Sequence, residues 1–153
     1  MGKPRYTVTL EANPAAEDLA VIRSGLDAFN RNAIEMDKSG EYEALHILIR
    51  ANDGTVMGGL LGGSWWGWLY ISILWVHEDL RGQDFGTDLM RAAELEGLRR
   101  GCHAAFVDTH SFQALDFYLK LGYTVFGELP DFPPGYTRYF LRKPLTGLAE
   151  IDS

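Results

Sequence analysis

The stretch VHEDLRGQDFGTDLM, residues 76–90, joins an apolar segment to an amphipathic one through a basic turn that contains glycine. Residues 68–76 (WLYISILWV) are typical of a buried strand, and residues from about 85 onward (FGTDLMRAAELEGLRRG) favour a helix. Gly82 and Gly86 allow a close approach of the backbone, and the free N–H groups at the start of a helix attract anions. The stretch therefore predicts a strand, a turn able to hold an anion, and a helix.

Arg81 strengthens this prediction, because its guanidinium can fork onto phosphate oxygens. The alternative interpretation is a plain tight turn, with glycines that serve only its geometry and a solvated surface arginine. From this stretch alone, the anion-binding turn and the plain tight turn are about equally probable.

Length and composition predict one globular domain over residues 1–153, because the chain is 46% hydrophobic and 23% charged. The net charge of −7, with fourteen scattered basic residues, argues against a nucleic-acid partner. An acidic surface favours a cationic small molecule, although the same charge also serves solubility. Cys102 is the single cysteine, and the four histidines show no zinc-type spacing with it. No structural metal is expected.

The apolar run from Gly59 to Val76 is interrupted by glycines and a serine, so two strands in a hairpin explain it better than a membrane helix. The first ten residues (MGKPRYTVTL) contain no apolar segment of signal-peptide length. We therefore expect a cytoplasmic protein without a membrane partner.

The order of expected elements predicts a mixed-sheet α/β or α+β layer fold. The expected order is strand, helix, three-strand meander, helix, strand, helix and two strands, and Ser111 is expected to cap the helix that follows the fifth strand. The elements are a strand 5–10, a helix from Pro14 to about Asn32, a loop 32–43, strands 44–51, 55–63 and 68–76, a helix from about 85 to 100, a strand 102–109, a helix 113–121, and strands 123–126 and 136–145.

Two stretches together resemble the GNAT superfamily of N-acetyltransferases. Residues 74–87 contain Arg81-Gly82-Gln83-Asp84-Phe85-Gly86-Thr87, which is similar to that family's pyrophosphate loop, Gln/Arg-x-x-Gly-x-Gly/Ala, after a strand. Residues 111–123 (SFQALDFYLKLGY) resemble the family's helix motif Asn-x-x-Ala-x-x-x-Tyr-x-x-x-Gly-Phe. The resemblance covers nearly the whole chain, from Tyr6 to about Leu145.

The resemblance implies a single, mostly antiparallel mixed sheet of about six to seven strands, flanked by helices and splayed between the fourth and fifth strands. It also implies acetyl-CoA as co-substrate, bound where those strands part. The implied cofactor-binding residues are Leu74, Trp75, Val76, Arg81, Gly82, Gln83, Asp84, Phe85, Gly86, Thr87, Ser111, Ala114, Phe117 and Lys120.

Acetyl transfer to an amine needs a neutral amine, an N–H donor for the developing oxyanion and a proton for the leaving thiolate. The Val76 N–H is a candidate for the oxyanion contact. Tyr118 matches the family's frequent general acid, and a tyrosine stays protonated at neutral pH. Tyr118 also has the helical spacing of a core residue with Ala114 and Leu121, which is the structural alternative.

Two positions depart from the family pattern. Asp84 stands at the middle glycine of the loop, where an inward carboxylate would repel a pyrophosphate. We expect it to point outward and cap the helix. Ser111 replaces the common asparagine, so its contact to the cofactor would be shorter or made through water.

The acceptor site is expected near an aromatic cluster suited to a cationic or flat molecule, although core packing and edge protection explain such a cluster as well. The cluster comprises Trp65, Trp66, Trp68, Tyr70 and Trp75; the candidate substrate residues are Phe29, Asn30, Trp68, Tyr70 and Asp131. Glu78, Asp108 and Asp131, and the histidines His77 and His110, are unranked candidates for a proton relay.

The sequence thus predicts an acyltransferase that moves the acetyl group of acetyl-CoA to a primary amine of a small molecule or peptide by direct attack. The rival hypothesis is a non-catalytic acyl-CoA-binding or regulatory module, and a third is a plain interaction domain of the same fold. A homodimer is left open as the assembly state.

Overall fold

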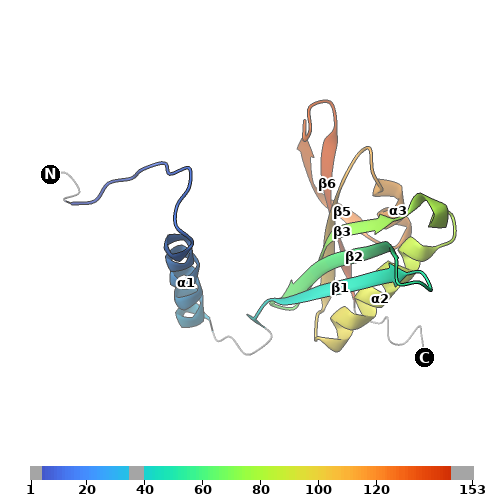
Figure 1. The fold of residues 1–153 in the computed structure, drawn as a ribbon, viewed down its shortest axis with the longest axis horizontal. Coiled ribbons are helices and arrows are strands. Elements are labelled where there is room, and N and C mark those ends of the chain that lie inside the picture. Colours follow the sequence, from blue (N-terminus) through green and yellow to red (C-terminus); the bar gives the residue numbers. More distant parts are fainter. Residues whose placement is uncertain (1–4, 35–39, 146–153) are drawn as a thin grey trace. The chain divides into compact units, whose positions relative to one another are not determined.

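A computed structural model describes residues 5–34 and 40–145 of the chain (Figure 1). The chain divides into two compact units, Met1–Met36 and Asp37–Ser153, which are described separately. One domain over the whole chain therefore stays a prediction.

The described residues of the first unit, 5–34, contain one helix, α1 (Ala16–Ala33), which confirms the predicted helix. Glu17 and Asp18 lie in its first turn, where acidic side chains stabilise the positive end of the helix. The strand predicted at residues 5–10 is wrong, because no described strand pairs with this segment. Alternating side chains favour a strand only when a partner completes the backbone hydrogen bonds.

The apolar side chains of α1 do not pack against other apolar residues within the first unit. Ile22, Leu26 and Phe29 are exposed, and the helix buries none of its residues. The spacing that predicted a core face is therefore present, but the first unit by itself does not provide the apolar surface that would cover it.

The second unit is a six-stranded sheet in the order β1-β2-β3-β4-β6-β5. Among the described strands only the β3–β4 pair is parallel, so the predicted mixed and mostly antiparallel sheet is confirmed. The loop predicted at 32–43 lies partly outside the described residues. The strands are β1 (Glu43–Arg50), β2 (Val56–Trp65), β3 (Trp68–Val76), β4 (Ala104–His110), β5 (Thr124–Pro130) and β6 (Thr137–Pro144).

The long helix α2 (Phe85–Arg99) covers one face of this sheet and forms the core with it (Figure 1). Met90 and Ala93 of α2 are buried, and so are Leu60 and Leu69 on the facing strands. A Cβ added at Gly97 would lie 3.1 Å from the Leu69 side chain, so helix and sheet pack closely here. This packing fixes the start of α2 beside the end of β3.

The parallel pair β3–β4 separates part-way along, as the resemblance implied. Pairing runs from Trp68 and Ala104 to Ile71 and Val107 and then stops. The β2–β3 register shifts at the same place, because Gly62 pairs with Ile71 whereas Leu61 pairs with Ile73. Ser72 is therefore the extra residue of a β-bulge, which bends β3 away from β4.

A buried ionic network holds the sheet and α2 together. Glu94 of α2 accepts hydrogen bonds from the Tyr123 hydroxyl at 2.9 Å and from Lys143 Nζ at 3.0 Å. Burial and the neighbouring Glu94 carboxylate raise the pKa of Tyr123 well above its usual value, so the hydroxyl keeps its proton. The network joins α2 to β6 and to the residue before β5.

The short helix α3 (Leu115–Lys120) corrects the predicted role of Ser111. The residue at the start of α3 is Ala114, and no side chain caps the helix there. The Ser111 hydroxyl instead accepts a hydrogen bond from the Thr137 N–H at 3.1 Å. A serine that precedes the helix by several residues is too far from its first turn to cap it.

Candidate active site

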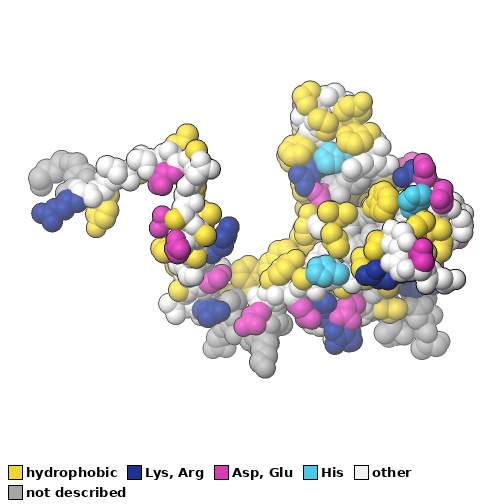
Figure 2. Space-filling view, in the orientation of Figure 1, with side chains coloured by type: hydrophobic (Ala, Val, Ile, Leu, Met, Phe, Trp, Pro, Cys, Tyr) yellow, Lys and Arg dark blue, Asp and Glu magenta, His cyan; other side chains and the backbone are white. Residues whose placement is uncertain are grey.

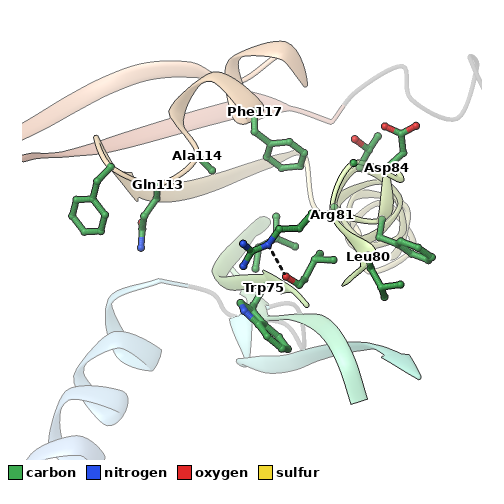
Figure 3. A pocket seen from close by; sticks show the side chains of 14 residues that line it. Trp75, Leu80, Arg81, Asp84, Gln113, Ala114 and Phe117 are labelled. Carbon is green, nitrogen blue, oxygen red and sulfur yellow. Dashed lines mark hydrogen bonds between the residues drawn. The ribbon is translucent and has the colours of Figure 1, made fainter. Parts of the chain in front are cut away.

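A cavity of about 660 Å³ opens where β3 and β4 separate (Figure 3). Three segments line it: the end of β3, the turn and first residues of α2, and the connection from β4 into α3. The lining residues are Leu74, Trp75, Val76, Leu80, Arg81, Gly82, Asp84, Phe85, Gly86, Thr87, Phe112, Gln113, Ala114 and Phe117. Eleven of these belong to the cofactor-binding residues that the resemblance implied.

The end of β3 offers unpaired backbone groups to this cavity. His77 donates to the Met57 carbonyl at 2.8 Å, and antiparallel pairs alternate between bonded and non-bonded. Because Met57 and His77 form a bonded pair, the next bonded pair along the register is Gly59–Trp75. Val76 and Leu74 belong to the non-bonded pairs, so they direct their N–H and C=O groups away from β2. They face the side on which β4 has ceased to pair. The Val76 carbonyl accepts a hydrogen bond from Arg81, and an extended ligand could bond to the remaining groups as an added strand.

The turn before α2 presents a row of free N–H groups. The first backbone bond into α2 runs from Asp88 to the Asp84 carbonyl at 3.0 Å. Within the described chain, no backbone carbonyl accepts from the six N–H groups of residues 82–87. These donors lie at the positive end of a fifteen-residue helix, which is a favourable site for phosphate.

Arg81 places a cation between this row and the edge of β3. Its Nε donates to the Val76 carbonyl at 3.3 Å, which orients the guanidinium in the cavity (Figure 3). The side chain is solvent-exposed and lines the cavity, so its role in binding an anion stays a prediction beside the alternative of a plain tight turn. Its terminal nitrogens can still bond to an anion.

Asp84 does not cap α2, which corrects one expectation. It occupies the capping position with φ 65° and ψ 15°, and its side chain makes no cap hydrogen bond. Side-chain caps use extended backbone, whereas this left-handed conformation favours glycine. The same conformation explains why the resemblance places a glycine here. The carboxylate is directed away from Arg81 (Figure 3).

Gly86 allows α2 and α3 to come close on either side of the cavity. A Cβ added at Gly86 would lie 3.3 Å from the Phe117 ring. Phe117 and Ala114 form the wall opposite the turn, so a side chain at position 86 would compete with a ligand for this space.

Tyr118 lies next to the cavity wall but does not line the cavity. It is 5% exposed, and its ring packs edge-on against Phe117 and Tyr123 at centroid distances of 5.1 and 5.9 Å. Burial raises the pKa of Tyr118 to about 12, so its hydroxyl is protonated at neutral pH. No residue in the described chain forms a hydrogen bond with that hydroxyl.

Three implied cofactor residues lie outside the cavity lining. Gln83 donates to the Asp79 carbonyl at 3.2 Å, Ser111 binds Thr137, and Lys120 is exposed at the end of α3. The cavity also has three lining residues that the sequence analysis missed, Leu80, Phe112 and Gln113. Phe112 and Gln113 occupy variable positions of the helix motif, and only their proximity to the motif could have indicated them.

A sequence profile of the Acetyltransferase (GNAT) family matches residues 13–123. This chain belongs to the GNAT family of acetyltransferases. It is 39% identical over 130 residues to the acetyltransferase Atu2258 of Agrobacterium fabrum, covering 84% of this chain and 91% of that protein. It is 40% identical over 93 residues to blasticidin-S acetyltransferase of Streptomyces morookaense, covering 60% of this chain and 68% of that protein.

The fold agrees with that of a solved acetyltransferase structure. The crystal structure of an acetyltransferase from Bacillus cereus superposes with a TM-score of 0.80 at 26% identity, covering 89% of this chain and 97% of that chain. The splayed sheet of this chain is therefore the GNAT fold.

The opposite face of the sheet is the face of the second unit that α2 does not cover. It carries three members of the predicted aromatic cluster, Trp65, Trp68 and Tyr70, whereas Trp75 lines the cavity and meets the His77 ring at 6.0 Å. Tyr70 stacks on Phe106 at 4.6 Å, and Trp68 meets the same ring edge-on at 5.9 Å. Trp65 also packs on Phe106, at 6.2 Å. Trp66 lies in the β2–β3 turn with φ 48°.

Polar side chains continue this face toward the place where β3 and β4 separate. Asp108 accepts a hydrogen bond from the Tyr70 hydroxyl at 3.0 Å through Oδ1 and one from Arg138 through Oδ2. The Arg138 guanidinium lies 4.9 Å from the Phe132 ring and 5.1 Å from the Phe140 ring. Figure 2 shows hydrophobic side chains gathered over the β5–β6 hairpin from which these rings come.

The other predicted substrate residues have separate locations. Asp131 lies in the β5–β6 turn and accepts a hydrogen bond from the Gly135 N–H at 3.2 Å. Phe29 and Asn30 belong to α1 in the first unit, so their role stays a prediction. Across residues 5–34 and 40–145, no group of three or more metal-ligating side chains is placed to hold a metal ion. No helix in these ranges is long and apolar enough to cross a membrane.

Proposed function

We propose that this protein transfers the acetyl group of acetyl-CoA to a primary amine of a small molecule or peptide. One observation carries the proposal: a free strand edge, a row of free helix-start N–H groups and Arg81 line a single cavity. An amide-containing arm that ends in a pyrophosphate needs both an added-strand partner and an anion site. Acetyl-CoA has that composition.

Different residues of this chain would orient the acetyl-CoA arm, stabilise the oxyanion and supply the proton. The Leu74 and Val76 edge orients the extended arm, and the Val76 N–H is available to stabilise the negative charge that develops on the carbonyl oxygen. The amine nitrogen attacks the carbonyl carbon directly. Tyr118, protonated and without a hydrogen-bond partner in the described chain, gives its proton to the departing sulfur.

The acceptor is proposed to approach from the opposite face of the sheet. Trp68, Tyr70 and Phe106 supply aromatic surface there, which suits a cationic or flat amine. Blasticidin S belongs in the first panel of acceptors, because this chain resembles the acetyltransferase named for it.

Binding and turnover test the proposal separately. Titration with acetyl-CoA, followed by thermal shift, should stabilise the wild-type protein, and the Arg81→Ala variant should require roughly tenfold more ligand for the same shift. Arg91→Ala, which removes a cation from the middle of α2, is the matched control and should bind like the wild type. Free thiol release is then measured with a panel of amines.

Asp84 motivates the rival proposal of an acyl-CoA-binding module without catalysis, because its carboxylate stands at the start of α2. Stabilisation by acetyl-CoA without thiol release for any amine, unchanged in Tyr118→Phe, would favour the module. Absence of any stabilisation would contradict both proposals and favour a plain interaction domain.

A further inference from the structure

Two histidines lie at the ends of the two strands that separate at the cavity, and hydrogen bonds fix their ring protons on different nitrogens. His77, directly after β3, accepts a hydrogen bond at Nδ1 from the Asp79 N–H at 3.1 Å. A backbone N–H can only donate, so a neutral His77 carries its ring proton on Nε2. The Nε2 atom of a neutral His77 is therefore a hydrogen-bond donor and cannot accept a proton.

His110, at the end of β4, has the reverse arrangement. Gln113 Oε1 accepts from the backbone N–H of His110 at 3.0 Å and lies 3.0 Å from His110 Nδ1. The backbone donor requires the carboxamide oxygen, not the nitrogen, at this position. An oxygen only accepts, so Nδ1 carries the proton and the lone pair of a neutral His110 is on Nε2.

The location of His110 connects this lone pair to the cavity. Its ring stacks on Phe112 at 5.3 Å and on Phe132 at 5.9 Å. Phe112 and Gln113 both line the cavity. In the β4–β6 register His110 lies opposite Arg138, whose guanidinium is bonded to Asp108. His110 is thus fixed beside the cavity, on the face of the sheet that carries the aromatic cluster.

The other relay candidates are already engaged or directed elsewhere. Both carboxylate oxygens of Asp108 hold hydrogen bonds, one of them from a guanidinium. Asp131 stabilises the β5–β6 turn. Glu78 is exposed in the 3-10 turn after β3. Neither Glu78 nor His110 lines the cavity itself, but His110 contacts two residues that do, Phe112 and Gln113. Among these candidates, His110 combines a position beside the cavity with a free lone pair.

We propose that His110 is the general base of the reaction, held in the required tautomer by Gln113. This inference rests on the proposed function, because it assigns the group that deprotonates the acceptor. His110 would be a catalytic residue and Gln113 a positioning residue.

The protons balance as follows. The acceptor ammonium gives one proton to His110 Nε2, and the neutral amine forms the C–N bond to the acetyl carbon. The C–S bond breaks, and the sulfur takes the proton of Tyr118. The acceptor nitrogen loses a second proton when it becomes the amide nitrogen. This proton passes through solvent to Tyr118 and restores its hydroxyl. The imidazolium of His110 then releases its proton to solvent, so one proton is released per turnover.

Matched acceptors test the role of His110. A primary alkylamine is an ammonium at neutral pH, whereas the alkoxyamine of the same shape is neutral and needs no base before attack. In His110→Ala, kcat/KM for the alkylamine should fall about 100-fold, and that for the alkoxyamine by less than about threefold. The KM of His110→Ala for acetyl-CoA should stay within about twofold of the wild-type value. His46 is an exposed histidine on β1, and His46→Ala should leave kcat/KM for both acceptors unchanged.

An equal loss for both acceptors, or no loss for either, would overturn the role of His110 while leaving the proposed function intact. If the wild-type protein acetylates no amine, the proposed function itself fails, and the base assignment fails with it.

The tautomer is tested independently of activity by ring ¹⁵N NMR spectra of the whole protein. The neutral His110 ring should show a protonated Nδ1 and a bare Nε2, and this preference should be lost in Gln113→Leu. A proton on Nε2 in the wild-type ring would overturn the inference, whatever the kinetics.

Discussion

The two ends of β3 have the same strand geometry and different surroundings. From Trp68 to Ile71 the strand has partners on both sides, β2 and β4, and its inward side chains are buried. From Ser72 to Val76 it has β2 alone, and its free edge becomes the wall of a cavity. The comparison shows that one extra residue, Ser72, divides β3 into two halves. The first half is hydrogen-bonded on both sides, and the second half has unpaired backbone groups on one side.

The largest effect should come from matched isoleucine truncations on either side of the bulge. Ile71 is 2% exposed and Ile73 is 53% exposed. Ile71→Ala should lower the free energy of unfolding by about 3–4 kcal/mol because it leaves a cavity in the core, whereas Ile73→Ala should lower it by less than about 1 kcal/mol. Urea denaturation measures both, and equal losses would break the comparison.

The next effect extends the comparison to two buried tyrosines. Tyr118→Phe should lower kcat about 100-fold, equivalent to about 2.7 kcal/mol, and change unfolding little, because its hydroxyl has no partner in the described chain. Tyr123→Phe removes the hydrogen bond to Glu94 and should lower the free energy of unfolding by about 1–2 kcal/mol with kcat unchanged. Thiol release and urea denaturation of both variants are required; the reverse pattern would exclude Tyr118 as the acid.

A smaller effect should appear at high pH. Because burial raises the pKa of Tyr118 to about 12 in the folded protein, against about 10 in the unfolded chain, the folded state holds this proton more tightly. The resulting stability is complete below about pH 10 and is lost as the pH rises toward 12. The wild type should lose about 2 kcal/mol relative to Tyr118→Phe over this range, measured by denaturation of both proteins. Parallel pH curves would show that the hydroxyl is not buried.

The smallest effect concerns Asp84, at the end of the turn that follows the free half of β3. Asp84→Gly should raise the free energy of unfolding by about 1 kcal/mol, because glycine adopts φ 65° without strain, and should tighten acetyl-CoA binding by removing a negative charge. Gln83→Gly is the control, since residue 83 has no positive φ, and it should not stabilise. Denaturation and thermal shift measure the two properties, and weaker binding by Asp84→Gly would assign the carboxylate a role in holding the ligand.

Part of this comparison could be predicted from the sequence. The bounds of β3 follow from its apolar run, and the turn and helix after it follow from Gly82 and an amphipathic pattern; the binding of an anion there stays a prediction. The family motifs indicated the splay. The bulge at Ser72 could not be placed, because register depends on which residues the partner strand presents.

Other features depend on contacts between segments distant in the sequence. Ser111 had the residue type of a helix cap, but β6 provides its partner through the Thr137 N–H. The tautomer of His110 depends on where the Gln113 carboxamide lies, which no spacing rule specifies. Residues 5–10 had strand alternation without a strand to pair with.

The β5–β6 hairpin offers a route to redesign. Every residue that lines the cavity comes from segments 74–87 and 112–117, whereas Phe132, Arg138 and Phe140 of the opposite face come from the hairpin and its turn. β5 is an edge strand, and β6 alone joins the hairpin to the rest of the sheet. Exchanging the tip of the hairpin between relatives would therefore bring new side chains to one face and leave the cavity walls unchanged. Under the proposed function, the surface that meets the acceptor could then change in evolution while the surface that meets the cofactor is kept.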